Sequence, residues 1–373
     1  MRKYYEDAKA FGEKHLKPFT KDIDVQGRFP VEAYNALREN GYMGLVVPEE
    51  FGGQGKDIVE HAEVCIGLSE SCASSALCYM MHNVGVRTIS MYASEELKKD
   101  LLPKIAAGEI TLGLAYSETG TGTHFYIPEM TEENKGDYSI LSGTKSMVTA
   151  AGQADYYLTL AKNVEEDTAN VWVVPANSEG LSFKEDVWDG VGMRGNESKP
   201  MVLDNIKIDN YYKMVGNGDG DREIFVVGLS SVCAGLAMHM VDASAEYVKS
   251  RTYSHASNLA NIETVQTHLA DMYTRAYAAR ETIYAAAQSG IDKDSDSFNH
   301  IIAARVNSTK AVLENATEGM RLFGGKGYVR HNLPMERLMR DAYAGQIMAP
   351  GIDVLRIWLG RLLVDLPYID IFR

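Results

Sequence analysis

A short loop rich in glycine and hydroxyl side chains is the first place in the chain where chemistry could occur. It runs from Leu114 to Thr123 and reads LAYSETGTGT. Glycines let backbone N–H groups approach a pyrophosphate closely, and hydroxyl groups supply further hydrogen-bond donors. The loop could therefore hold a phosphate-bearing cofactor, although the same composition also suits an ordinary turn.

The residues around this loop have the composition of β-strands. From about residue 113 to 213, short runs rich in aromatic and β-branched residues are separated by Gly, Asn and Asp, as at 155–160, 170–174 and 201–208. This pattern predicts a middle domain, residues 113–213, that forms a small antiparallel β-barrel or sandwich.

Helical patterns lie on both sides of this region. In residues 1–112, Pro30 and Gly41 bracket VEAYNALREN as helix start and stop signals, and residues 95–105 keep helical spacing. In residues 214–373, apolar residues recur three and four positions apart and predict one face of a long helix in an antiparallel bundle. These residues are Ile262, Val265, Leu269, Met272, Ala276, Ala279, Ile283 and Ala286. The sequence therefore predicts an α+β protein with a helical N-terminal domain (1–112), the β-domain and a C-terminal helical bundle (214–373).

Composition limits the classes of function. The chain has 373 residues, of which 45% are hydrophobic and 24% charged, which suits two or three packed units. With 51 acidic and 37 basic residues the net charge is −14, which argues against a nucleic-acid partner. The four cysteines have neither metal-ligand spacing nor the density of a disulfide scaffold. No run of about 18 apolar residues occurs, so we expect a cytoplasmic protein without a membrane partner.

Several further segments resemble one family. The strings GGKGY at 324–328 and PMERLMRDA at 334–342 resemble the GGxGY, PxER and RDA motifs of the acyl-CoA dehydrogenases. VPEEFGGQG at 47–55 resembles their VPEExGGxG, and GTKSMVT at 143–149 their GxKxxIT. The loop at 114–123 is similar to their xTEPGAGS. The resemblance implies FAD as cofactor, a C-terminal four-helix bundle and a homotetramer built as a dimer of dimers.

The resemblance also assigns cofactor residues. In the loop at 114–123 and the strand after it, it implies that the isoalloxazine and pyrophosphate contact Leu114, Tyr116, Ser117, Gly122, Thr123, Met147 and Thr149. From a neighbouring subunit it implies that the adenine half contacts Arg251, Arg321, Gly324 and Gly325. Two departures occur here, because Ser254 and His255 stand where relatives have Phe-Gly and Arg321 replaces a usual Gln.

The residue that the family uses as its catalytic base is missing. In relatives a glutamate in a Tyr-Glu-Gly-Thr string follows RDA and removes the α-proton of an acyl thioester. Counting without a gap from Arg340, the string here is Met348-Ala349-Pro350-Gly351. A methyl group cannot accept a proton, so the ordinary proton transfer is excluded.

The second base position known in the family is apolar as well. It corresponds to Phe225, and Val226 follows where many relatives have Arg. With Met348, Ala349 and Glu223, these residues are the expected substrate-binding set. The remaining candidates for proton transfer are His82, which also suits a hydrogen-bonded core position, and Glu223, whose position in relatives contacts the pantetheine arm. The segment 192–198 resembles the family's GxRxSxT beside the acyl-CoA channel and equally suits a surface turn.

Three functions follow from this reading. The first is an FAD-dependent oxidoreductase that acts on acyl-CoA or another thioester, with hydride transfer to the flavin, a non-standard proton route and an acceptor such as an electron-transfer flavoprotein. The second is base-independent flavin chemistry of the monooxygenase or desulfinase type. The third, a non-catalytic structural protein, is disfavoured because Ser117, Gly122, Thr123 and Thr149 persist.

Overall fold

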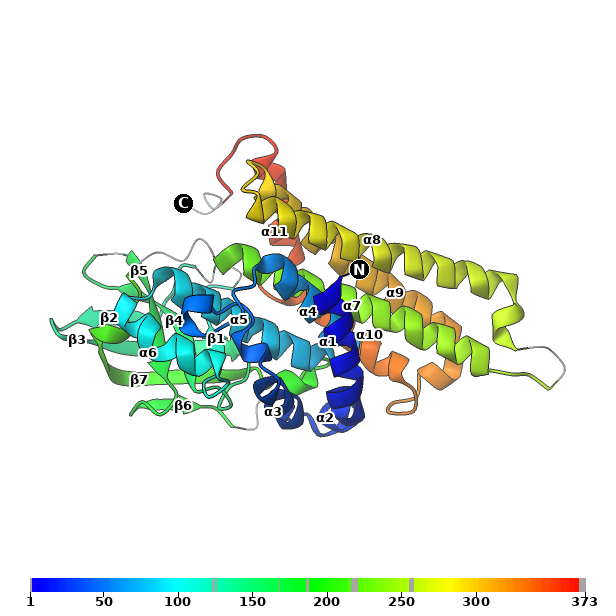
Figure 1. The fold of residues 1–373 in the computed structure, drawn as a ribbon, viewed down its shortest axis with the longest axis horizontal. Coiled ribbons are helices and arrows are strands. Elements are labelled where there is room, and N and C mark those ends of the chain that lie inside the picture. Colours follow the sequence, from blue (N-terminus) through cyan, green and yellow to red (C-terminus); the bar gives the residue numbers. More distant parts are fainter. Residues whose placement is uncertain are drawn as a thin grey trace.

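The computed structural model describes residues 2–122, 124, 126–166, 168–185, 188–215, 221–254 and 258–368. The molecule is elongated, with the strands at one end, the C-terminal helices extending to the other and the N-terminal helices between them (Figure 1). The order of elements is helices, then strands, then helices, as the sequence predicts.

The N-terminal part is helical throughout. Its helices are α1 (Lys3–His15), α2 (Thr20–Gln26), α3 (Val31–Glu39), α4 (Ile58–Ser69), α5 (Ala73–Tyr92) and α6 (Glu95–Ala106), with short 3-10 turns η1 (Lys17–Phe19), η2 (Tyr42–Gly44) and η3 (Glu49–Phe51). Helix α3 begins after Pro30, and Gly41 follows it with a left-handed φ of 73°, so both local signals are confirmed. Ser94 caps α6, because its side chain accepts a hydrogen bond from the Leu97 N–H at 3.2 Å.

The middle part is a seven-stranded sheet of β1 (Leu112–Ala115), β2 (Thr131–Asn134), β3 (Tyr138–Val148), β4 (Tyr156–Asn163), β5 (Thr168–Pro175), β6 (Leu181–Phe183) and β7 (Lys199–Asp209). It also carries the short turns η4 (Arg194–Asn196) and η5 (Asn210–Tyr212). One expectation needs correction, because the pairing is mixed and not purely antiparallel. Strands β1 and β2 both pair in parallel with β4, one after the other along the same strand, whereas β5 pairs antiparallel with β4. Strand composition predicts strands but does not determine which neighbours pair.

The C-terminal part is a helical bundle. It consists of α7 (Asp221–Ser250), α8 (Glu263–Ile291), α9 (Ser297–Gly327) and α10 (Pro334–Ile347), with η6 (Leu259–Asn261) before α8 and α11 (Ile352–Leu362) against α9. The face predicted for α8 is confirmed at Val265, Met272, Ala276, Ala279, Ile283 and Ala286, which are buried. Ile262, by contrast, precedes the helix and is 43% exposed.

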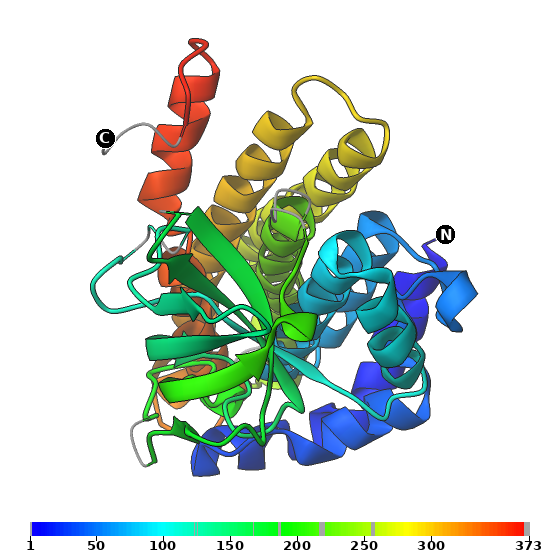
Figure 2. The ribbon, with the colours of Figure 1, turned by 90° about the vertical axis from the view of Figure 1, so that its left-hand side faces the viewer.

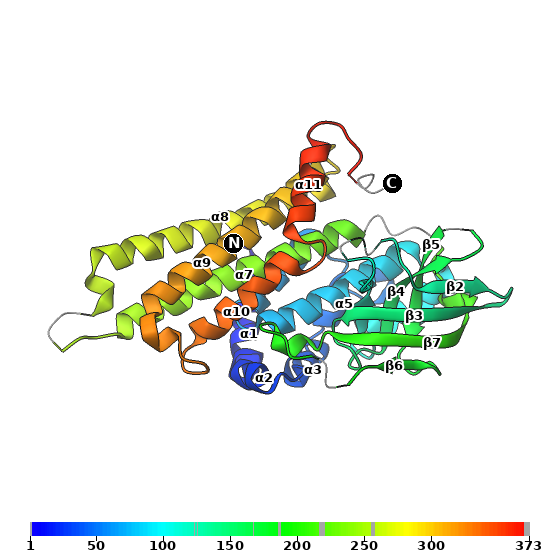
Figure 3. The same cartoon turned by 180° about the vertical axis from the view of Figure 1, so that it is seen from behind.

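Helices α5 and α7 form the centre of the molecule. Helix α5 packs on α7, on α4 and on β1, which places it between the bundle and the strands (Figure 3). Viewed from the strand end, the sheet lies in front of the helices (Figure 2). The segment Arg222–Ser250 of α7 is long and apolar enough to cross a membrane, but 89% of its most apolar window is buried inside the protein. It is therefore the core helix of this fold.

Candidate functional site

A cavity of about 860 Å³ lies where the sheet meets α5, α7 and α10. Leu77 and Met81 of α5 and Phe225 of α7 form an apolar wall. The opposite walls come from the glycine-rich loop, from the end of β3, from the segment 188–198 and from α10 with the residues that follow it. All three parts of the chain therefore contribute to one cavity.

The glycine-rich loop is held by a buried ion pair. The Lys145 ammonium of β3, which is fully buried, donates to the Glu118 carboxylate and to the Leu160 carbonyl at 2.7 Å. The other oxygen of Glu118 accepts the Glu129 N–H at 2.6 Å. Burial lowers the pKa of Lys145, and the hydrogen bond to Glu118 opposes that shift. The Ser146 N–H also donates to the Ser117 carbonyl at 2.8 Å, so the loop is tied to β3 on two sides.

Most of the predicted flavin residues line this cavity. Leu114, Tyr116, Ser117, Gly122, Met147 and Thr149 all contribute to its wall. Thr149 is buried, whereas Met147 is 62% exposed. Met147 therefore does not pack in the interior as an ordinary buried strand residue would. Gly122 has a φ of 56°, and no atom lies within 4 Å of the position a Cβ would take. Thr123 lies outside the described residues.

The residues predicted to hold the adenine half are elsewhere in the same chain. Arg251 directly follows α7 and lies over the Tyr253 ring at 4.9 Å. The C-terminal end of α7 lies at the end of the bundle far from the strands (Figure 1). Arg321 is largely exposed and pairs with Glu318 at 3.3 Å. Gly324 breaks α9 with a φ of 56°, and both Gly324 and Gly325 face open space. His255 lies outside the described residues. One chain therefore does not bring these residues to its own cavity.

The residues that the resemblance assigns to the base positions are apolar and line the cavity. Met348 and Ala349 line it from the turn after α10, and Phe225 lines it from α7. Glu223, by contrast, lies against α8, because its Oε2 atom is 3.1 Å from the position that a Cβ would take on Gly290. Val226 is a core residue that is 3% exposed. The structure therefore places Glu223 and Val226 outside the described wall, contrary to expectation.

His82 is a structural residue. It is fully buried, its Nε2 donates to the Met43 carbonyl at 3.0 Å, and its Nδ1 accepts the Leu112 N–H at 3.1 Å. Burial lowers the pKa of His82 to about 4. His82 is not among the described wall residues, so of its two interpretations the structure supports the hydrogen-bonded core position and not the proton shuttle.

The described part of the cavity wall contains little that could accept a proton near neutral pH. Glu118 is its only carboxylate among the described residues, and that group is already engaged by Lys145 and two backbone N–H groups. The other polar members are hydroxyls, amides, an indole and one guanidinium, namely Tyr116, Ser117, Ser146, Thr149, Trp188, Asn196, Ser198, Arg340, Tyr343 and Gln346. No histidine is among these described wall residues.

The segment 188–198 is fixed over the cavity by charged residues from both ends of the chain. Arg340 of α10 donates to both Asp24 oxygens at 2.9 and 2.6 Å, to Glu336 at 2.6 Å and to the Val191 carbonyl at 2.9 Å. The Met193 N–H donates to Asp341 at 2.6 Å. Burial raises the pKa of Asp341 to about 6. No sequence signal linked Asp24 to Arg340, because the two residues are 316 positions apart.

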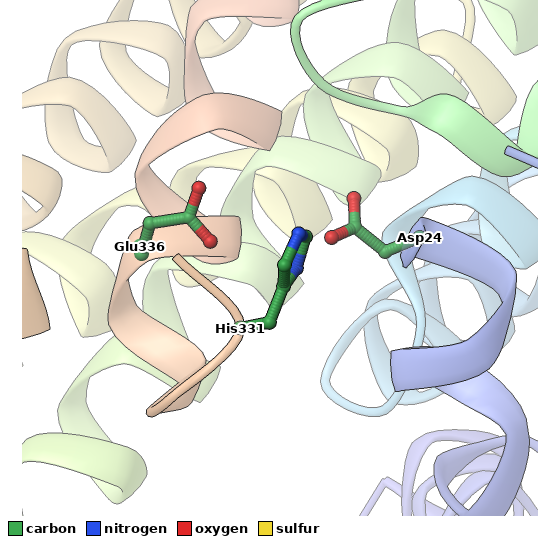
Figure 4. A group of neighbouring side chains, drawn as sticks. All are labelled: Asp24, His331 and Glu336. Atoms are coloured by element: carbon green, nitrogen blue, oxygen red, sulfur yellow. The ribbon is translucent and has the colours of Figure 1, made fainter. Parts of the chain in front are cut away.

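Asp24, His331 and Glu336 form a group that could in principle hold a metal ion (Figure 4). Their ligand atoms lie within 4.8 Å of one another, and the His331 ring lies between the two carboxylates. Both carboxylates, however, are already paired with the Arg340 guanidinium. We therefore treat the group as part of the ion network that holds the segment 188–198.

Comparison with known proteins agrees with this architecture. Residues 2–109, 113–206 and 227–361 match the N-terminal, middle and C-terminal domains of acyl-CoA dehydrogenase. The chain belongs to the acyl-CoA dehydrogenase family. The probable acyl-CoA dehydrogenase of Mycobacterium leprae is 30% identical over 369 residues, which cover 95% of this chain and 93% of that protein.

Solved structures of family members have the same fold. A glutaryl-coenzyme A dehydrogenase in complex with glutaryl-CoA superposes with a TM-score of 0.91 at 24% identity, covering 98% of this chain and 95% of that one. An FAD-dependent dehydrogenase superposes with a TM-score of 0.85 at 26% identity, covering 98% and 97%. The cavity of this chain is lined by the apolar residues Phe225 and Ala349, among others.

Proposed function

We propose that this protein is an FAD-dependent oxidoreductase that acts on an acyl thioester and lacks the usual proton acceptor. The observation that carries the proposal is the single cavity shared by Tyr116, Ser117 and Thr149, on the cofactor side, and by Phe225 and Ala349, on the substrate side. Membership of the acyl-CoA dehydrogenase family and the similarity to an FAD-dependent dehydrogenase support FAD as the cofactor.

The residues present fit a flavin. Gly122 leaves open space at a left-handed backbone position, as expected where a backbone N–H must approach a ligand closely. The Ser117 and Thr149 hydroxyls offer hydrogen bonds on the same wall, and the exposed Met147 side chain offers an apolar surface for a ring. When bound, FAD supplies an acceptor for hydride, and the chain's own residues orient the substrate beside it.

Among the described residues, the substrate side of the cavity is largely apolar and supplies no carboxylate or imidazole to accept a proton. Leu77, Met81, Phe225 and Met348 suit the hydrocarbon part of an acyl group. Removal of an α-proton would need a base, and loss of a general base commonly slows such a step by about 10²–10⁴-fold. In this proposal the proton passes to a group of the substrate or to water.

Base-independent flavin chemistry is the second candidate. The specific observation in its favour is that Glu118, the only carboxylate among the described wall residues, is sequestered by Lys145. A reaction of the monooxygenase or desulfinase type, which does not remove an α-proton, would need no base in place of the family's glutamate. A purely structural role is disfavoured by the intact cavity.

The proposal is tested by spectroscopy of the purified protein. We expect a flavin absorption band, and anaerobic titration with butyryl-, octanoyl- and branched acyl-CoAs should bleach it slowly if the protein is a dehydrogenase without its base. Ala349→Glu should then accelerate bleaching, because a carboxylate again faces the substrate. Ala344→Glu is the control, since it places a carboxylate in the same wall five residues earlier, on α10.

The two candidates give opposite results. If the native reaction is base-independent, Ala349→Glu should impair it by placing a charge among apolar residues. A preparation that is colourless and takes up no added FAD would reject both candidates.

We further infer a homotetramer in which a neighbouring subunit completes the FAD site, with an electron-transfer flavoprotein as acceptor and a cytoplasmic location. The absence of Arg251, Gly324 and Gly325 from the described lining of their own chain's cavity supports the assembly, because a neighbouring copy would then have to supply them. Light scattering of the flavin-loaded protein measures the mass directly.

A further inference from the structure

A buried arginine that forms no ion pair with any described residue lies directly behind the wall of the cavity. Arg305, on α9, is fully buried. Its guanidinium donates hydrogen bonds to the Gly345 carbonyl at 2.7 Å, to the Thr309 hydroxyl and to the Cys233 sulfur at 3.4 Å. None of these partners is a carboxylate, although an arginine stays charged in proteins. The described part of the chain therefore buries this cation without a counter-ion.

Such a charge does little for the stability of the fold. Moving a cation from water into the interior is costly, and hydrogen bonds to groups other than carboxylates offset only part of that cost. Apolar side chains of similar volume often replace buried ionic groups with no loss of stability. A role in the neighbouring site therefore accounts for Arg305 better than a contribution to stability does.

The guanidinium meets α10 at the end of that helix. In a longer helix the Gly345 carbonyl would accept the Ala349 N–H, but α10 ends at Ile347, and Met348 has a non-helical ψ of 122°. Arg305 supplies a donor to this carbonyl from a different helix. A cation at this position also complements the negative end of the helix dipole. Arg305 is therefore a C-terminal cap of α10.

The capped end of α10 carries part of the cavity wall. Residues on both sides of Gly345 line the cavity, namely Ala344, Gln346, Met348 and Ala349. Gly345 itself is buried and faces the opposite way, because a Cβ placed on it would lie only 3.0 Å from the Cys233 sulfur. A single stretch of backbone therefore separates the guanidinium from the wall.

We propose that Arg305 is a positioning residue that holds Met348 and Ala349 at the substrate side of the cavity and thereby sets its affinity for the acyl thioester. Arg305 does not touch the ligand and acts through the backbone of α10. The inference deepens the proposed function and rests on it, because the thioester must bind in this cavity for the position of the wall to affect its affinity.

The test compares Arg305→Met, Arg305→Lys and Gly345→Ala with the wild-type protein. Methionine removes the charge and the donors, lysine keeps a charge and a donor, and the added methyl at 345 presses on the Cys233 sulfur without removing any charge. One arm measures the affinity for butyryl-CoA and octanoyl-CoA from the perturbation of the bound flavin's spectrum. The other measures hydrogen exchange of the Met348 amide in the apoprotein, where it donates to the Ala344 carbonyl at 3.0 Å.

Arg275→Met is the matched control. Arg275 is a partly buried arginine of α8, and its partners Asn315, at 3.1 Å, and Glu314, at 3.6 Å, lie on α9 and not on α10. This change should lower the stability of the bundle without altering thioester affinity or the exchange of the Met348 amide.

We expect Arg305→Met to weaken thioester binding about tenfold, the effect of one lost hydrogen bond, with FAD affinity unchanged and with faster exchange at Met348. Gly345→Ala should change both arms in the same direction, and Arg305→Lys should restore most of the affinity. The double variant Arg305→Met/Gly345→Ala should lose no more than Arg305→Met alone, because both changes act on one contact.

Unchanged thioester affinity in Arg305→Met would overturn the proposal. An equal loss in Arg275→Met would do the same, because general destabilisation would then explain both results. If Arg305→Met does not fold, Gly345→Ala decides in its place, and unchanged affinity there overturns the proposal.

Failure of the proposed function is seen separately, as a wild-type protein that binds no FAD or no thioester. The exchange arm then still decides whether Arg305 positions the end of α10. Faster exchange at Met348 in Arg305→Met supports the positioning, and unchanged exchange refutes it. The two failures are therefore distinguishable.

Discussion

Replacing Lys145 by methionine tests the ion pair that holds the cofactor loop. Lys145 and Glu118 have side-chain exposures of 0% and 3%, so water screens neither charge. Removing one partner of a buried pair commonly costs about 3–5 kcal/mol, because the other charge stays buried without compensation. The Glu118 carboxylate keeps the N–H groups of Glu129 and Met130 as donors, so we expect the lower end, about 3 kcal/mol.

The loss is measured as the free energy of unfolding in urea, followed by tryptophan fluorescence and extrapolated to water. Lys104→Met is the control, because its pair with Asp100 at 2.6 Å is half exposed and screened by water. Adding Glu118→Gln to Lys145→Met should restore part of the stability by removing the orphaned charge. FAD affinity should fall in Lys145→Met because the glycine-rich loop loses the buried ion pair that holds it. A loss below about 1 kcal/mol for Lys145→Met, equal to that of a surface pair, would refute the reasoning.

Two further substitutions separate a functional role from a structural one and test how the stability of the protein depends on pH. Thr149→Ala should alter the flavin spectrum or its reduction rate more than the melting temperature, and the reverse pattern would make Thr149 an ordinary strand residue. Asp341 has a folded pKa near 6, above its usual value, so its contribution to stability is present at low pH and is lost as the pH rises toward 6. The side chain of Asp341→Asn cannot ionise but can still accept a hydrogen bond from the Met193 N–H. The free energy of unfolding of this variant, relative to wild type, should therefore grow by about 1.4 kcal/mol per pH unit between pH 4 and 6. Urea titrations at several pH values measure this, and a constant difference would contradict the assignment.

Signals that act within a few residues predicted much of this structure. Pro30 and Gly41 delimit α3 because their backbone preferences act locally, and the spacing of apolar residues identified the buried face of α8. The prediction that Ala349 takes the position of the family's glutamate also rests on a local signal, the count from an adjacent motif. These features need no knowledge of distant contacts.

The parts that could not be predicted depend on contacts between distant segments. The parallel pairing of β1 with β4 joins residues that two other strands separate in the chain. His82 was ambiguous because its partners, Met43 and Leu112, lie about thirty or more positions away on either side.

The contact between Arg340 and Asp24 has a consequence for how the chain is made. A ribosome releases Asp24 early, but its guanidinium partner follows 316 residues later. Until Arg340 emerges, the nascent protein carries an acidic group without its cation at a site that the finished protein buries, and the segment over the cavity lacks its hydrogen bond to α10. The N-terminal helices can form during synthesis, but the cavity can close only near the end of translation. Fragments that stop before α10 should therefore depend on chaperones and be prone to degradation.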